Sequence, residues 1–217
     1  MRWPGTLPLR LAVFDMDSTL IQAEVIDELA RLHGVHAQVS EVTRRAMAGE
    51  LDFEQSLRQR VATLQGLEVN RLAELAQSLP LMDGAEALLA GLRAMRCRTA
   101  VVSGGFMFAA RVVKSRLGLD HAYANTLAVA EGKLTGEVAG AVVTPDRKAE
   151  VFAELLALEG CAKESSMAVG DGANDRLMLA AAGVGVAFHA KPVLREAADV
   201  VVDEGALDQL LPWLSPS

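Results

Sequence analysis

The stretch Leu9-Arg-Leu-Ala-Val-Phe-Asp-Met-Asp-Ser-Thr-Leu20 decides how the rest of the chain is organised. Its first half is an apolar run, which predicts a short buried strand over residues 9–14. The run ends at Asp15 and Asp17, and this i, i+2 spacing sends both carboxylates to the same side. Two carboxylates held this close repel each other unless a cation or a proton lies between them. The stretch therefore predicts a charged site at the end of a buried strand.

Composition limits the class of protein. The chain has 217 residues, enough for one well-buried core or for one core with a small inserted domain. The net charge of −7 and an aromatic content of 4% argue against nucleic acid as a partner, because nucleic-acid binding requires a basic face and stacking rings. Cys97 and Cys161 lack the spacing of a metal site or a redox pair. We expect both thiols to stay reduced, as in a cytoplasmic protein.

No segment suggests a membrane location. The residues before Asp15 contain no apolar stretch typical of a signal peptide. The longest apolar run, Leu177 to Phe188, falls short of the roughly 20 residues that a membrane-spanning helix needs. We therefore expect a soluble, cytoplasmic protein that does not bind membranes.

Strand and helix patterns alternate after Pro80. Such alternation predicts right-handed βαβ units and a parallel sheet covered on both faces, the Rossmann-like α/β class. The expected helices are 84–92, 107–117, 147–159 and 175–182. The expected strands are 99–102, 122–123, 167–169, 184–187 and 199–201, with a hairpin over 126–143.

Residues 22–80 show no strand pattern. Phe53, Leu57, Val61 and Leu64 form one apolar stripe with helical spacing, and a second stripe follows before Pro80. We therefore predict an α/β catalytic core over 1–21 and 81–217, with a small inserted helical-bundle cap over 22–80.

Three polar clusters follow predicted strands directly: Asp15–Thr19, Ser103–Gly105 and Gly170–Asp175. In open parallel sheets, ligands bind beyond the carboxyl ends of the strands, so we expect the clusters to converge. A calcium loop is excluded for the first cluster because Leu20 and Ile26 stand where the loop needs glycine and glutamate. Several carboxylates at one sheet edge favour a hard cation such as Mg²⁺.

Other readings stay open for the individual residues. Ser103-Gly104-Gly105 fits an oxyanion-binding turn before a helix, but it is equally explained as an ordinary turn. Lys148 falls near the start of a predicted helix, where a solvated surface lysine is the commoner case. It is also placed to neutralise a phosphate or a nucleophilic carboxylate.

Four motifs, taken in order, resemble those of the haloacid dehalogenase superfamily. They are Asp15-Met-Asp17-Ser-Thr19, Ser103-Gly104-Gly105, Lys148 and Gly170-Asp171-Gly172-Ala173-Asn174-Asp175. Further segments, among them Glu24-Val-Ile-Asp27-Glu28 and the run from Phe53 to Arg60, resemble the phosphoserine phosphatases within that superfamily. The resemblance extends from about Leu9 to Leu211. It implies the haloacid dehalogenase fold.

The resemblance also implies a catalytic mechanism. Asp15 would be the nucleophile that forms an aspartyl-phosphate, and Asp17 the general acid and base. Lys148 would be the third catalytic residue. Mg²⁺ would be held by a metal site comprising Asp15, Asp17, Asp171 and Asp175. The substrate-binding set would be Thr19, Glu24, Met47, Phe53, Arg60, Ser103, Gly104, Lys148 and Asn174.

Within that set the resemblance assigns specificity to the cap. Glu24 would bind the substrate ammonium and Arg60 the substrate carboxylate, while Met47 and Phe53 would exclude water. Arg60 shares the inward apolar face of its helix, which Arg58 does not, and a planar guanidinium suits a carboxylate. Glu24 could instead simply favour the helix dipole, and core packing would also account for Met47 and Phe53.

The implied activity is hydrolysis of O-phosphoserine, the last step of serine biosynthesis. Alternatives are phosphoryl transfer to another hydroxyl such as that of homoserine, hydrolysis of another small phosphate ester, or a binding module without activity. We expect a small-molecule substrate as the partner and either a monomer or a homodimer. Because only eight residues precede Leu9, we expect no N-terminal regulatory domain.

Overall fold

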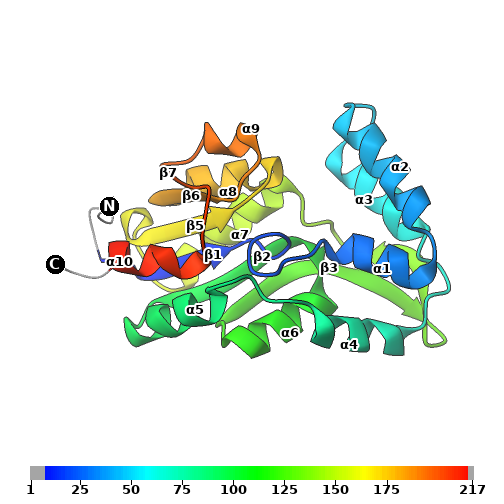
Figure 1. Cartoon of the computed structure of the whole chain (residues 1–217), viewed down its shortest axis with the longest axis horizontal. Coiled ribbons are helices and arrows are strands. Elements are labelled where there is room, and N and C mark those ends of the chain that lie inside the picture. Colours follow the sequence, from blue (N-terminus) through cyan, green and yellow to red (C-terminus); the bar gives the residue numbers. More distant parts are fainter. Residues whose placement is uncertain (1–7, 215–217) are drawn as a thin grey trace.

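The computed structural model describes residues 8–214 as a seven-stranded sheet with helices on both faces (Figure 1). The strand order is β4-β3-β2-β1-β5-β6-β7, and every neighbouring pair is parallel except β3 with β4. The strands are β1 (Leu11–Phe14), β2 (Arg98–Phe106), β3 (His121–Ala130), β4 (Lys133–Ala139), β5 (Ser166–Gly170), β6 (Val184–Phe188) and β7 (Val200–Val202). The predicted α/β class is confirmed.

Two hydrophobic cores lie on the two faces of the sheet. Ala12 and Phe14 of β1 point into the larger core, with α5 (Ala85–Ala94) and α6 (Met107–Leu117). Leu11 and Val13 point into the second core, with α7 (Pro145–Leu158) and α8 (Arg176–Ala181). Because successive side chains of a strand alternate between faces, β1 is buried on both sides and its end is rigidly placed.

Residues 22–80 fold into four helices: α1 (Val25–His33), α2 (His36–Met47), α3 (Phe53–Ala62) and α4 (Val69–Ser78). Figure 1 shows α2 and α3 rising away from the sheet, with α3 still in contact with β4, whereas α4 packs against α6. The chain enters and leaves this segment side by side, since the Gln22 N–H donates to Pro80 O (2.9 Å) and the Met82 N–H to Leu20 O (2.8 Å). Its division from the core as a cap remains a prediction, and residues 1–7 and 215–217 of the predicted core lie outside the described residues.

The segment between α3 and α4 pairs with the edge strand β4. The Gly66 N–H donates to Leu134 O (2.9 Å), the Leu134 N–H to Leu67 O (2.8 Å) and the Val69 N–H to Gly132 O (2.9 Å). Gly66 adopts a φ of 89°, which favours glycine at this turn. The inserted helices are thus joined to the β3–β4 hairpin by backbone hydrogen bonds.

Three expectations for the fold were wrong in detail. β2 continues to Phe106, where an end at 102 was expected, and its register against β3 shifts between Val102 and Phe106. The expected strand 122–123 and the first half of the hairpin form one long strand, β3, which pairs with β2 and then with β4. The short helices α9 (Pro192–Arg195) and α10 (Leu211–Leu214) are missing from the sequence-based prediction because four residues cannot show a helical period.

Candidate active site

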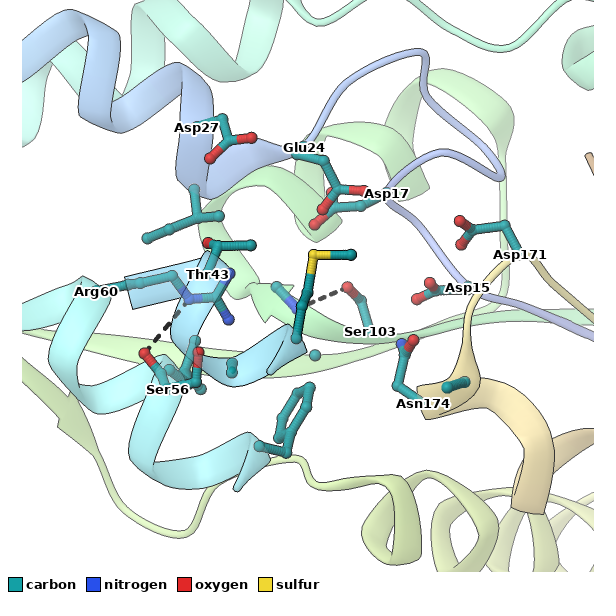
Figure 2. Close-up of a pocket in the computed structure, with 18 of the residues that line it drawn as sticks. Asp15, Asp17, Glu24, Asp27, Thr43, Ser56, Arg60, Ser103, Asp171 and Asn174 are labelled. Carbon is teal, nitrogen blue, oxygen red and sulfur yellow. Dashed lines mark hydrogen bonds between the residues drawn. The ribbon is translucent and has the colours of Figure 1, made fainter. Parts of the chain in front are cut away.

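The predicted site residues gather around one cavity of about 530 Å³ at the carboxyl end of the sheet (Figure 2). The sheet edge forms its floor, and residues of α1, α2 and α3 form the opposite wall. Ten predicted residues line it: Asp15, Asp17, Glu24, Met47, Phe53, Arg60, Ser103, Gly104, Asp171 and Asn174. The three polar clusters therefore converge as expected.

Lys148 and Asp175 lie buried beneath this cavity, together with Thr19. Lys148 Nζ donates to Asp15 Oδ1 (2.7 Å) and to Asp175 Oδ1 (2.7 Å), and its side chain is fully buried. The alternative that Lys148 is a solvated surface lysine is therefore wrong. The Thr19 hydroxyl is buried without a hydrogen-bond partner, so its assignment to substrate binding remains a prediction.

The start of α7 explains how Lys148 reaches this position. The helix begins at Pro145, two residues earlier than expected, because the Thr144 hydroxyl caps it by accepting from the Arg147 N–H (3.2 Å). Burial alone would lower the pKa of Lys148, but the charges of Asp15 and Asp175 outweigh burial and raise it. Lys148 is thus a permanent cation at the base of the site.

Three carboxylates form a cluster in which one oxygen of each lies within 4.8 Å of the others: Asp15, Asp171 and Asp175. Burial, followed by repulsion from Asp175, raises the pKa of Asp15 to about 7, although Lys148 opposes the shift. Burial and Asp175 likewise raise the pKa of Asp171 to about 6. One lysine does not neutralise three carboxylates, so the cluster fits a bound cation.

The members of this cluster differ in how many of their oxygens are already used. Both oxygens of Asp175 already accept hydrogen bonds: Oδ1 accepts from Lys148, and Oδ2 accepts from the Asp171 and Gly172 N–H groups (3.2 and 3.1 Å). Asp15 Oδ1 accepts from Lys148, and the side chain of Asp171 makes no hydrogen bond within the described chain. The two Asp171 oxygens are therefore the ligands most available to a metal ion, and Oδ2 is the Asp15 oxygen that Lys148 leaves free.

Asp17 occupies a different environment from Asp15. Its Oδ1 is buried without a hydrogen-bond partner. Burial, then the charges of Glu24 and Asp15, raises the pKa of the Asp17 carboxyl well above its usual range. A raised pKa favours the protonated carboxyl, which is the form that can act as a general acid.

Ser18 connects Asp17 to Glu24. Its backbone adopts a φ of 57°, in the left-handed region that is uncommon for a residue with a side chain. Its hydroxyl donates to Glu24 Oε1 (2.9 Å). This bond holds the Glu24 carboxylate at the rim of the cavity.

Ser103, Gly104 and Gly105 lie at the far end of β2, in the part of the strand that extends beyond the predicted end at residue 102. The Gly105 N–H donates to Ser103 Oγ (2.8 Å). A Cβ at Gly104 would lie 2.8 Å from the Phe53 ring, and one at Gly105 would lie 2.9 Å from Asp17 Oδ2. Only glycine allows the backbone to approach both groups this closely.

Two arginines of α3, Arg58 and Arg60, lie on different faces of the helix, as expected. Arg58 pairs with Glu54 on the surface (2.6 Å). Arg60 is largely buried, its Nε donates to Ser56 O (3.3 Å), and Figure 2 shows its guanidinium pointing into the cavity. Burial lowers the pKa of Arg60, while Asp27 and Glu24 oppose that shift.

Met47 lines the cavity but 81% of its side chain is exposed. It lies at the last residue of α2, where the helix wall ends. The alternative that core packing accounts for Met47 is therefore wrong, whereas its role in excluding water remains a prediction.

Several cavity residues escaped the sequence analysis: Asp27, Thr43, Ser56 and Lys191. Asp27 lies one helical turn after Glu24, so the same helix face carries both carboxylates. Lys191 precedes α9 and its N–H donates to Asp171 O (2.9 Å). No local pattern marks it, because α9 has only four residues.

Among residues 8–214, no helix is long and apolar enough to cross a membrane. Cys97 and Cys161 are both free thiols.

Comparison with known proteins places this site in a family. The family model for haloacid dehalogenase-like hydrolases matches residues 9–183. A phosphoserine phosphatase of Methanocaldococcus jannaschii is 43% identical, over 94% of this chain and 97% of the relative. One of Idiomarina loihiensis is 47% identical, over 95% of this chain and 94% of the relative. The chain spans only 55% of an Archaeoglobus fulgidus phosphoserine phosphatase that is 47% identical to it.

Solved structures agree with these relatives. A structure described as a phospho-aspartyl intermediate analogue of phosphoserine phosphatase superposes with a TM-score of 0.89 at 42% identity. It covers 96% of this chain and 100% of the other. A substrate-bound phosphoserine phosphatase complex gives the same values. The resemblance found in the motifs is confirmed, and the chain belongs to the haloacid dehalogenase-like hydrolases, among which its near relatives are phosphoserine phosphatases.

Proposed function

We propose that this chain is a magnesium-dependent phosphatase that hydrolyses O-phosphoserine to serine and inorganic phosphate, the last step of serine biosynthesis. The observation that carries the proposal is the buried Asp15–Lys148–Asp175 arrangement beneath a cavity whose opposite wall presents Arg60. One end of that cavity offers a nucleophile to phosphorus, and the other offers a cation to a carboxylate.

Asp15 is the nucleophile in this proposal. Since Oδ1 accepts from Lys148, Oδ2 is the oxygen free to attack phosphorus. The new O–P bond makes an aspartyl-phosphate while the bond from phosphorus to the serine oxygen breaks. Asp17 gives its proton to the leaving serine oxygen, and its raised pKa keeps that proton available. Water then attacks the aspartyl-phosphate, Asp17 takes a proton back, and phosphate leaves.

The cradle for the phosphoryl group consists of the Ser103 hydroxyl and the Gly104 N–H, with the Lys148 ammonium nearby. Negative charge spread over the phosphoryl oxygens is stabilised by such fixed donors.

Mg²⁺ suits the acidic cluster because all the available ligands are oxygens. Asp15, Asp171 and Asp175 would hold it, with Asp17 contributing through its backbone carbonyl and Asn174 supporting the site. When bound, Mg²⁺ supplies charge neutralisation between the nucleophile and the phosphate.

Substrate choice is assigned to the inserted helices, which we propose to act as a cap over 22–80. Arg60 binds the substrate carboxylate and Glu24, fixed by Ser18, binds the ammonium. Phe53 covers Gly104, and Met47 closes the rim against water when substrate is bound. An amino-acid phosphate is favoured over a sugar phosphate by this pair of opposite charges.

A panel of phosphate esters tests the proposal. With Mg²⁺, phosphoserine should release phosphate far faster than sugar phosphates, and EDTA should abolish the release. Asp15→Asn should lose the activity, whereas Asp203→Asn, at a surface ion pair with Arg195, should keep it. Equal turnover of all esters contradicts the specificity, and an active Asp15→Asn contradicts the mechanism.

Phosphoryl transfer to homoserine is the second candidate, and phosphohomoserine formed from phosphoserine would reveal it. We also propose a cytoplasmic location, which the unpaired thiols of Cys97 and Cys161 support. Sedimentation of the purified protein decides between the proposed monomer and homodimer.

A further inference from the structure

Asn125 is a buried side chain of β3 that uses both of its polar ends. Only 1% of the residue is exposed. Its Nδ2 donates to Gly104 O (2.8 Å), and its Oδ1 accepts from the Val143 N–H (2.7 Å). It lies beneath the cavity without lining it, at the point where the register of β2 against β3 shifts.

The first bond fixes the peptide between Gly104 and Gly105. The carbonyl of this peptide accepts from Asn125, and its N–H donates to Ser103 Oγ (2.8 Å). Two successive glycines have wide conformational freedom, so an unheld peptide here could rotate. Because Ser103 Oγ already accepts one hydrogen, its own hydroxyl proton is free to be donated to a phosphoryl oxygen.

The second bond fixes the approach to α7. Val143 immediately precedes Thr144, the residue that caps the helix carrying Lys148. Lys148 in turn holds Asp15 Oδ1. One amide side chain therefore connects the end of β2 to the start of the helix that positions the nucleophile.

We propose that Asn125 is a positioning residue that aligns the phosphate cradle at Ser103–Gly104 with the Lys148–Asp15 pair. The proposal rests on the proposed function, since it assumes that the cradle binds the phosphoryl group. Asn125 touches neither substrate nor metal and acts only through the two backbone groups that it holds.

A purely stabilising role is the competing explanation. Loss of Asn125 would leave Gly104 O and the Val143 N–H buried and unpaired, which destabilises a fold whatever its activity. The test therefore needs readouts that a change in stability does not affect. It also needs a control variant that loses a buried side-chain hydrogen bond elsewhere. Thr99→Val is that control, because Thr99 is buried in β2, the strand that contains Gly104, but bonds to Asp120 at the opposite end of the strand, away from the cavity.

The experiment compares Asn125→Leu, Asn125→Asp and Thr99→Val at a temperature well below the melting point of each. Asn125→Asp keeps the acceptor for Val143 but loses the donor to Gly104. Both Asn125 variants should lower kcat/KM by about 10–100-fold, somewhat less than the loss of a whole oxyanion donor. The factor should be equal for phosphoserine and p-nitrophenyl phosphate, which share only the phosphoryl group, and Thr99→Val should be near wild type.

A double variant gives the decisive readout. If Asn125 acts through the cradle, adding Asn125→Leu to Ser103→Ala should slow the enzyme by less than about threefold beyond the slower single variant. Additive losses, or Asn125 variants that match Thr99→Val, overturn the proposal. Orthovanadate binding measured by calorimetry should weaken in parallel, and Asn125→Asp carries the test if Asn125→Leu does not fold.

The two proposals fail in distinguishable ways. Wild-type protein that does not hydrolyse phosphoserine contradicts the proposed function alone, because p-nitrophenyl phosphate and orthovanadate still report on the cradle. Hydrolysis of phosphoserine with unaffected Asn125 variants contradicts only the role of Asn125.

Discussion

Replacing Asp171 with asparagine should make the metal-free protein more stable while destroying its response to Mg²⁺. Asp171 is 8% exposed, and its carboxylate faces Asp175 without a hydrogen bond of its own in the described chain. Its backbone bonds to Asp175 and Lys191 do not involve the side chain and should survive the substitution. The variant therefore removes a buried charge and keeps the local backbone.

The size of the effect follows from the pKa of Asp171. Burial and Asp175 raise that pKa from its usual 3.8 to about 6. Since a tenfold change in acidity corresponds to 1.36 kcal/mol, ionised Asp171 destabilises the metal-free fold by about 3 kcal/mol at neutral pH. A buried amide costs part of this gain, so we expect a net stabilisation of about 1–3 kcal/mol, or roughly 2–10 °C in Tm.

The sign with pH is fixed by the direction of the shift. Well below the unfolded pKa of 3.8 the residue is protonated in both the folded and the unfolded state, so Asp171→Asn loses its electrostatic advantage there and should be no more stable than wild type. Between pH 4 and 6 the folded state retains the proton that the unfolded state loses. The wild type therefore loses stability across this range, and the variant gains its full advantage above it.

Urea unfolding in EDTA, repeated with saturating Mg²⁺, measures both effects. Mg²⁺ should stabilise the wild type by about 3 kcal/mol at a hundredfold excess over Kd and should stabilise the variant much less. Asp203→Asn, which removes a surface carboxylate, is the control and should change stability by less than about 0.5 kcal/mol. A metal-free Asp171→Asn that is less stable than wild type at neutral pH would refute the reasoning.

Three further predictions concern other parts of the molecule. Arg60→Ala should reduce kcat/KM for phosphoserine by a factor that corresponds to a loss of about 2–5 kcal/mol, but it should spare the hydrolysis of p-nitrophenyl phosphate. The surface variant Arg58→Ala should spare both substrates. Parallel losses on the two substrates would mean that the role of Arg60 is structural. Gly105→Ala should lower kcat in steady-state assays without unfolding the protein, because the added methyl collides with the proposed general acid, and unchanged turnover would remove that argument. Burial raises the pKa of Cys97 to about 12, so iodoacetamide near pH 8 should label Cys161 and should label Cys97 only after unfolding, as mass spectrometry of the digested protein can show.

The strand ends were predictable because two local signals coincide there. An apolar run that stops at aspartate, serine or glycine marks both the strand and the functional edge, and all three such places line the cavity. The stripe through Phe53 and Leu57 likewise placed Arg60 inside and Arg58 outside.

What escaped prediction depends on contacts between distant segments. From the sequence, Lys148 is expected to be a surface residue, because the carboxylates that pair with it in the interior lie 133 and 27 positions away along the chain. β2 reads as ending at 102 because glycine lacks a strand propensity, yet pairing with β3 carries it to Phe106. The role of Asn125 is invisible for the same reason, since both of its partners are backbone groups from other elements.

The pairing of the 66–69 segment with β4 also bears on how copies of this protein behave toward one another. An unpaired edge strand is a template for aggregation through intermolecular sheets. At one edge of this sheet, outer backbone groups of β4 and of Gly132 just before it already pair with Gly66, Leu67 and Val69. At the other edge, β7 is only three residues long. The segment that joins α3 to α4 thus also covers part of an edge that would otherwise be open to pairing with another copy through an intermolecular sheet.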